Sequence, residues 1–130
     1  MTMASSHSRR MTIIVNDADS VSGLFECPEG ARSCLLLAPG AGAGMEHPFM
    51  ASMASDLAAG GIATLRYQFP YMERQGKRPD SPPLCHATVR AAARMSRELM
   101  PEAALFAGGK SFGGRMTSQA QALSPLTGAS

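Results

Sequence analysis

Short apolar runs predict the β-strands of this chain. The predicted strands occupy residues 11–15, 21–27, 33–38, 62–67 and 103–108. The first two flank a turn-forming stretch at residues 16–20, so they indicate a β-hairpin. The run at residues 33–38 is apolar almost throughout, which is typical of a strand covered on both faces of its sheet.

Longer segments with a helical spacing of apolar residues follow the later strands. The predicted helices cover roughly residues 48–60, 81–101 and 112–123. Pro48 suits a first helical turn, and Pro101 ends the second helix. That second helix has one apolar face, and its arginines Arg90, Arg94 and Arg97 lie largely opposite, where we expect them to meet water.

The alternation of strands and helices after the hairpin predicts an α/β fold. We expect a mostly parallel sheet with an antiparallel hairpin at one edge and helices on both faces. Residues 68–83 are rich in Pro, Gly and charge and therefore predict a loop. The polar, Ser-rich residues 1–10 predict a disordered tail before a single domain at residues 11–130.

Composition narrows the class of protein. With 130 residues and a hydrophobic content of 45%, the chain suits one globular domain. Its net charge of +2 is too small to indicate a nucleic acid or an anionic membrane as partner, and no apolar run approaches the roughly 20 residues of a membrane-spanning helix. Cys27, Cys34 and Cys85 form no CxxC pair, so we predict neither a metal site nor a disulfide framework, and a cytoplasmic setting.

The segment Gly109-Lys110-Ser111-Phe112-Gly113 lies between a predicted strand and a predicted helix. A sharp turn at such a junction exposes a nucleophilic Ser, but it crowds the backbone and requires Gly two residues before and after the Ser. Gly109 and Gly113 meet this requirement, and the following helix N-terminus favours developing negative charge. We interpret Ser111 as the nucleophile of a nucleophile elbow. The alternative is a Gly-rich helix start with a capping Ser.

A second Gly-rich loop, at residues 39–44, directly follows the third predicted strand. The carboxyl ends of parallel strands meet at one edge of a sheet, so this loop should lie beside the elbow. Backbone N–H groups from two such loops can stabilise an oxyanion. Those of Phe112 and Ala41 are the candidate donors, and Gly40 and Gly42 stay open as alternatives to Ala41.

Residues 104–111 also match a relaxed Walker A motif, in which Ala104 replaces the first Gly. A phosphate-binding loop must be flexible and must expose its backbone, whereas residues 105–107 are apolar and fit a buried strand. A nucleoside triphosphatase is therefore the weaker interpretation.

The pattern Gly40-x-Gly42-x-Gly44 is similar to a dinucleotide-binding loop, but Met45 stands where that motif has its third Gly. The next strand carries Arg66 where an acidic residue should hold the ribose, which would at best suit a 2′-phosphate. Dinucleotide binding is disfavoured as well.

With both loops in place, the sequence resembles the α/β-hydrolase superfamily. Three blocks carry the resemblance: LLLAPGAGAGMEHPFM at 35–50, RYQFPYMERQGKRPD at 66–80 and AGGKSFGGRM at 107–116. They look like the dienelactone-hydrolase-like branch that includes testis-expressed protein thirty and the third subunit of the non-specific lethal complex. The resemblance implies an esterase-like fold with Ser111 at the nucleophile position. Pro39 departs from the pattern, because many members have His there.

A catalytic base for Ser111 is missing from the sequence pattern. In this superfamily the acid and the His of the triad follow the nucleophile, yet no His, Asp or Glu follows Ser111 here. We expect His47 at a helix start or a pocket wall and His86 at a helix surface. Lys110 adjoins Ser111, but adjacent side chains at a sharp turn diverge.

These features predict a serine hydrolase for an ester or related acyl substrate, with no metal and no cofactor. Because the resemblance places the acid and the His in later strands, we expect this chain to be an N-terminal part that is inactive alone. The alternative is a non-catalytic interaction module that retains the hydrolase fold. The strand at residues 103–108 would form an exposed apolar edge, open to self-association or to the absent half.

Overall fold

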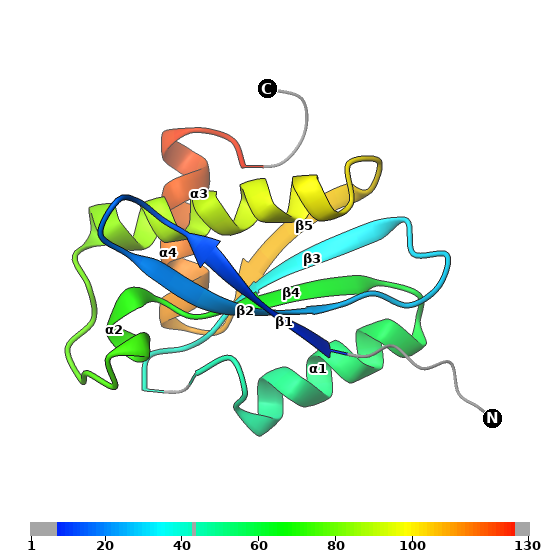
Figure 1. The fold of residues 1–130 in the computed structure, drawn as a ribbon, viewed down its shortest axis with the longest axis horizontal. Helices are drawn as coiled ribbons and strands as arrows, with labels where there is room; N and C mark the ends of the chain where they lie inside the picture. The colour runs from blue at the N-terminus through cyan, green and yellow to red at the C-terminus, as the bar shows by residue number, and fades with distance from the viewer. Residues whose placement is uncertain (1–7, 43, 127–130) are drawn as a thin grey trace.

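The computed structural model describes residues 8–42 and 44–126, which form a five-stranded sheet with helices on both faces (Figure 1). The strands are β1 (Ser8–Ile14), β2 (Ser20–Glu26), β3 (Ser33–Ala38), β4 (Ala63–Tyr67) and β5 (Ala104–Gly109). The helices are α1 (Pro48–Ala59), α2 (Pro70–Glu73), α3 (Pro82–Leu99) and α4 (Phe112–Leu123). Each element except the short α2 corresponds to a predicted one.

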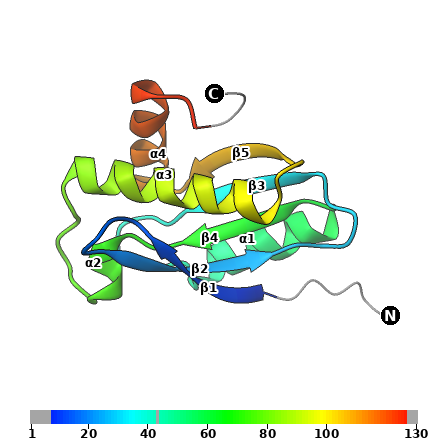
Figure 2. The same cartoon turned by 45° about the horizontal axis from the view of Figure 1, so that its top comes forward.

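The sheet has the strand order β1-β2-β4-β3-β5 and is mixed. β3 pairs in parallel with β4 and β5, whereas β2 runs antiparallel to both β1 and β4. Helix α1 covers one face, and α3 and α4 lie on the other, as Figures 1 and 2 show from two directions. The predicted α/β fold with an antiparallel hairpin at one edge is confirmed.

The core lies mainly between the sheet and the pair α3 and α4. Leu36 of β3 and Leu65 of β4 are paired across the strands and almost completely buried. They belong to one apolar cluster with Val89 of α3 and Met116 of α4. Burying each such side chain contributes roughly 1.5–3 kcal/mol to stability, so this layer holds β3 and its neighbours in place.

The first strand begins earlier than the sequence pattern predicts. β1 starts at Ser8, so the predicted disordered tail at residues 1–10 extends three residues too far; residues 1–7 lie outside the described part of the chain. β2 continues to Glu26 and offers Ser8 a pairing partner there. The Arg9 guanidinium also lies 5.6 Å from the centroid of the Phe25 ring, which favours the extended pairing.

The predicted loop at residues 68–83 contains the helical turn α2. Pro70 occupies its first turn, where the missing N–H costs nothing. The carboxylate of Asp80 accepts a hydrogen bond from the Tyr71 N–H at 2.9 Å and lies 3.1 Å from the Arg74 guanidinium. Contacts with Asp80, nine residues after Tyr71, stabilise a turn that local composition does not predict.

Two of the three arginines on α3 bind protein rather than water alone. Arg90 donates to the carbonyl of Ala120 at 2.7 Å, and Arg97 donates to the carbonyl of Leu126 at 2.7 Å. The Ala120 carbonyl also accepts from the Ser124 N–H at 3.1 Å, and Arg90 donates a second hydrogen bond to the Ser124 carbonyl at 3.2 Å, so Arg90 stabilises the C-terminal end of α4. Arg94 is exposed, as expected. No helix within residues 8–42 and 44–126 combines the length and apolar character needed to span a bilayer.

β5 ends the strand order, and within the described residues its outer edge pairs with no strand. The strand contains neither a charged residue nor Pro, which commonly protect sheet edges. Phe106 near its centre is 55% exposed. We propose that this edge pairs with another strand, and that in the isolated chain the partner is a second copy.

Phe106→Lys should weaken such self-association, because the ammonium group would lose water when a second strand covers the edge. Sedimentation velocity should show concentration-dependent association of the wild-type chain and a monomeric variant. Ile14→Lys is the matched control, since Ile14 is a 65% exposed apolar residue on the opposite edge strand β1. Equal association of all three proteins would contradict a role for the β5 edge.

Candidate functional site

Ser111 lies in the turn between β5 and α4, at the N-cap of the helix. Its φ of 51° and ψ of −111° fall outside the regions that non-Gly residues favour. Such a conformation typically costs about 1–3 kcal/mol and persists only where surrounding contacts impose it. The contacts here include hydrogen bonds from the Lys110 N–H to the Ala38 carbonyl (3.1 Å) and from the Gly113 N–H to the Lys110 carbonyl (2.9 Å).

Two glycines make this turn sterically feasible. A Cβ at Gly109 would lie 2.8 Å from the Gly113 carbonyl carbon and 2.9 Å from the Ala38 Cβ. A Cβ at Gly113 would overlap the Pro39 carbonyl oxygen. The end of β5, the start of α4 and the end of β3 therefore pack backbone against backbone. The sequence spacing of Gly109 and Gly113 around Ser111 reflects this contact.

The exposed Ser111 side chain opens onto a small pocket. It makes no capping hydrogen bond to α4, so the alternative of a capping Ser is not supported. The pocket has a volume of about 150 Å³ and is lined by Gly40, Ala41, His47, Met50, Lys110 and Ser111. A Cβ at Gly40 would lie 3.8 Å from the Ser111 Cβ. The loop that follows β3 and the elbow thus meet at one site, and Ala41, a candidate donor, lies on its wall.

Phe112, the other candidate donor, anchors the start of α4 on an aromatic cluster. Its ring packs edge-to-face with Phe69 at a centroid distance of 5.5 Å and with Tyr71 at 6.3 Å. Burial raises the pKa of the Tyr71 hydroxyl, which has no hydrogen-bond partner among the described residues. Tyr71 thus contacts Phe112 and lines, together with Gly42, a second pocket beside the Gly-rich loop.

His47 caps α1, which confirms its predicted place at a helix start and a pocket wall. Its Nδ1 accepts a hydrogen bond from the Phe49 N–H at 3.1 Å. A neutral imidazole with this bond carries its proton on Nε2, so His47 presents a donor rather than a base to its surroundings.

The other basic side chains considered for Ser111 point elsewhere. The Lys110 ammonium lies 5.4 Å from the centroid of the Phe49 ring, toward α1. His86 pairs with Gln119 at 2.8 Å between α3 and α4. Within the described residues, no group of three or more His, Cys, Asp or Glu side chains could hold a metal ion.

Arg66 is held inside the protein by polar contacts that the sequence pattern did not predict. It is 4% exposed, and burial lowers the pKa of its guanidinium while the carboxylate of Glu26 opposes this shift. Its Nη2 lies 3.6 Å from Glu26, and its Nη1 donates to the Met45 carbonyl at 3.1 Å. Nη2 also donates to the Ser8 hydroxyl at 3.1 Å, so both Nη atoms are engaged by protein, whereas the buried Nε has no hydrogen-bond partner among the described residues. Because the Nη atoms are engaged and residues 105–107 lie in β5, neither nucleotide-binding interpretation is supported.

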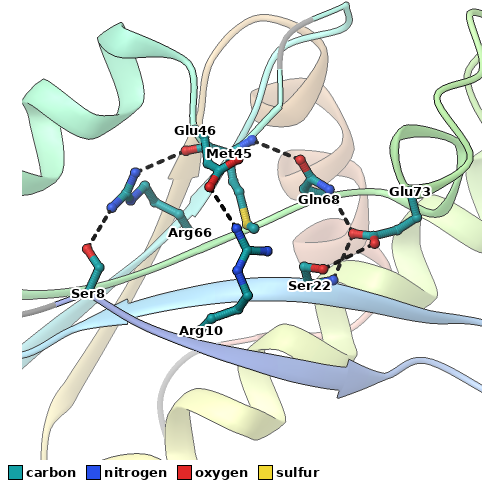
Figure 3. A network of polar contacts seen from close by, with 8 residues as sticks. All are labelled: Ser8, Arg10, Ser22, Met45, Glu46, Arg66, Gln68 and Glu73. Atoms are coloured by element: carbon teal, nitrogen blue, oxygen red, sulfur yellow. Dashed lines mark hydrogen bonds and ion pairs between the residues drawn. The ribbon is translucent and has the colours of Figure 1, made fainter.

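The polar residues around Met45 were also missed as a group. Arg66, in β4, and Gln68, directly after it, contact Met45, and Glu73 of α2 contacts Gln68 (Figure 3). One feature of the sequence could have indicated this group: Arg66 is charged, but it lies in a strand that is buried and mostly apolar. A buried cation requires a nearby acceptor, so this signal pointed to an unidentified partner.

A protein-family model described as an alpha/beta hydrolase domain matches residues 31–130. Comparison with curated protein sequences finds no significant match.

Solved structures similar to this chain share its architecture. A dienelactone hydrolase from Anabaena variabilis superimposes with a TM-score of 0.81 at 20% identity, over 94% of this chain and 60% of that protein. A serine hydrolase without lid from Xanthomonas campestris gives 0.74 at 20% identity, over 89% and 56%. A cold-adapted esterase from an Arctic intertidal metagenomic library gives 0.72 at 18% identity, over 95% and 58%. The chain spans at most 60% of the length of these three structures.

Gly113→Ala should destabilise the protein strongly, because the new Cβ would collide with the backbone of Ala38 and Pro39, which cannot move aside as a flexible side chain could. We expect the free energy of unfolding to fall by about 2–4 kcal/mol, measured by chemical denaturation. Gly108→Ala is the matched control, since no atom lies within 4 Å of a Cβ there. Similar stabilities of the two variants would contradict the packing described for the elbow.

Proposed function

The chain belongs to the α/β-hydrolase family, and from that premise we propose that it is a serine hydrolase whose nucleophile is Ser111. The observation that carries this proposal is the strained backbone of Ser111. It places a hydroxyl group that makes no capping hydrogen bond at the wall of a pocket. Strain of this kind is concentrated at functional sites. The family match supports a hydrolase, and the narrower branch suggested by the sequence stays a prediction.

In the proposed reaction, the Ser111 Oγ attacks an acyl carbon while its proton passes to a base, and the resulting oxyanion collapses as the ester C–O bond breaks and the alcohol leaves with that proton. Water then hydrolyses the acyl-serine and regenerates Ser111. The N–H groups of Phe112 and Ala41 stabilise the oxyanion, helped by the N-terminus of α4. Removing one such donor typically costs about 10²–10³ in rate, so both loops must be well placed. The substrate that we propose is a small ester or related acyl compound, in line with the esterase and dienelactone hydrolase among the similar structures.

The described site contains no side chain placed to accept the Ser111 proton. No His, Asp or Glu follows Ser111, and His47 is engaged at Nδ1 by the Phe49 N–H. We therefore propose that the base and its acid belong to residues outside this sequence, and that the chain alone turns over esters near background. We also propose a cytoplasmic setting, because Cys34 and Cys85 are buried free thiols.

A fluorophosphonate probe tests the nucleophile directly. A general base typically contributes about 10²–10⁴ in rate, so we expect slow labelling that added imidazole accelerates by serving as the base. Intact-mass analysis with peptide mapping should place the label on Ser111, and Ser111→Ala should abolish it. Ser118→Ala, at an exposed position of α4, is the control and should label like wild type.

The opposite result has a defined meaning. A folded wild-type chain that takes up no label at Ser111, even with imidazole present, would refute the proposed nucleophile. It would favour a non-catalytic interaction module with the hydrolase fold, for which the absence of His, Asp and Glu after Ser111 is the supporting observation.

A further inference from the structure

Both backbone polar groups of Met45 are held by side chains from the end of β4 (Figure 3). The Arg66 guanidinium donates to the Met45 carbonyl at 3.1 Å, and the Gln68 Oε1 accepts from the Met45 N–H at 3.3 Å. Met45 itself is 1% exposed. It directly follows the Gly-rich loop, whose residues Gly40 and Ala41 line the pocket beside Ser111.

The orientation of the Gln68 amide is imposed by Glu73. The carboxylate of Glu73 only accepts hydrogen bonds, so the Gln68 Nε2 must face it, and it donates to Glu73 Oε2 at 2.7 Å. The Gln68 Oε1 is thereby directed at Met45. Glu73 is fixed in turn by the Ser22 N–H at 2.8 Å and the Ser22 hydroxyl at 3.1 Å. The chain of contacts thus runs from β2 through α2 to the Gly-rich loop.

Gln68 approaches the loop so closely that a side chain at Gly44 would force its amide to shift. A Cβ there would overlap the Gln68 Oε1. The carbonyl of Gly44 also accepts from the His47 N–H at 3.1 Å, which closes the turn into α1. Gly44, Met45 and His47 are therefore held as one unit, so a displacement of Met45 would move the residues that line the pocket.

We infer that Gln68, oriented by Glu73, is a positioning residue: by holding Met45, directly after the Gly-rich loop, it sets Gly40 and Ala41 of that loop against the elbow. This inference rests on the proposed function, because it concerns the loop that supplies the proposed oxyanion donor Ala41. Oxyanion donors act only within hydrogen-bonding distance of the developing charge, and a displacement of about 1 Å can cost on the order of 100-fold in rate. Gln68 acts through the position of the loop rather than through contact with substrate.

Exchanging the amide and the carboxylate side chains between positions 68 and 73 tests the inference. Gln68→Glu alone places two carboxylates where an amide now donates to one, so the loop should lose its anchor. In the double variant Gln68→Glu with Glu73→Gln, the amide at position 73 can donate from Nε2 to the carboxylate at position 68. Its Oε1 can accept from Ser22, whose N–H and hydroxyl are held by the two Glu73 oxygens in wild type. The carboxylate at position 68 can still accept from Met45. Gln75→Glu, an exposed residue just after α2, is the control for added charge.

Amide hydrogen exchange followed by NMR reports on the loop without needing activity. Gln68→Glu should speed exchange at Met45 and its loop neighbours by about tenfold or more relative to α3, and the double variant should restore protection. In imidazole buffer the labelling of Ser111 by fluorophosphonate should fall by about tenfold or more in Gln68→Glu and recover in the double variant. Gln75→Glu should match wild type in both measurements.

The two readouts separate this inference from the proposed function. If wild type takes up no label, the proposed function fails, while the exchange data still decide whether Gln68 holds the loop. If wild type is labelled but Gln68→Glu leaves exchange and labelling unchanged, the inference is wrong and the proposed function stands. Uniform loss of protection throughout α3 as well as the loop, or no recovery in the double variant, would assign Gln68 a general structural role and overturn the inference.

Discussion

The geometry of the candidate site depends on the contact between two glycines and the end of β3. Gly109 and Gly113 approach Ala38 and Pro39 so closely that neither glycine has room for a Cβ. This contact brings the first turn of α4 against the sheet and forces the chain through a sharp turn at Ser111. The position of Ser111 is therefore set by backbone packing, and its hydroxyl makes no capping hydrogen bond to α4.

Two different kinds of contact hold Phe112 and the Gly-rich loop beside Ser111. Edge-to-face contacts with Phe69 and Tyr71 hold the ring of Phe112. Hydrogen bonds from Arg66 and to Gln68 hold the Gly-rich loop at Met45. Apolar contacts exclude water but define direction only loosely, whereas hydrogen bonds restrict both distance and angle. A directional support suits the loop, because its proposed task is to aim a backbone N–H at a small oxyanion.

The strand that leads into the elbow, β5, is also an edge strand of the sheet. β5 packs against β3 on one side, and within the described residues no strand lies on its other side. Any element that covers this edge would also stabilise the strand end from which Ser111 emerges. Pairing at this edge and the position of Ser111 are therefore coupled, since both depend on the same six-residue strand.

Much of the architecture is encoded locally and could be predicted from the sequence. β3 and α4 have their predicted boundaries because Gly and Pro interrupt clear apolar patterns beside them. The elbow was also identifiable, because steric crowding around Ser111 demands Gly at two fixed positions, and such a demand is visible in one short segment. The early start of β1 and the turn α2 escaped prediction, since Glu26 and Asp80, which stabilise them, are not sequence neighbours.

By itself, then, the sequence determined the α/β fold class, the strand-turn-helix at Ser111 and the two loops that meet there. Only the tertiary structure decided how the Gly-rich loop is held. Arg66 and Gln68 lie 21 and 23 positions after Met45, and no periodic pattern links them. Their hydrogen bonds depend on where β4 places two side chains relative to a loop that follows β3. That relation is a property of the assembled sheet, because the two strands become neighbours only when the chain folds.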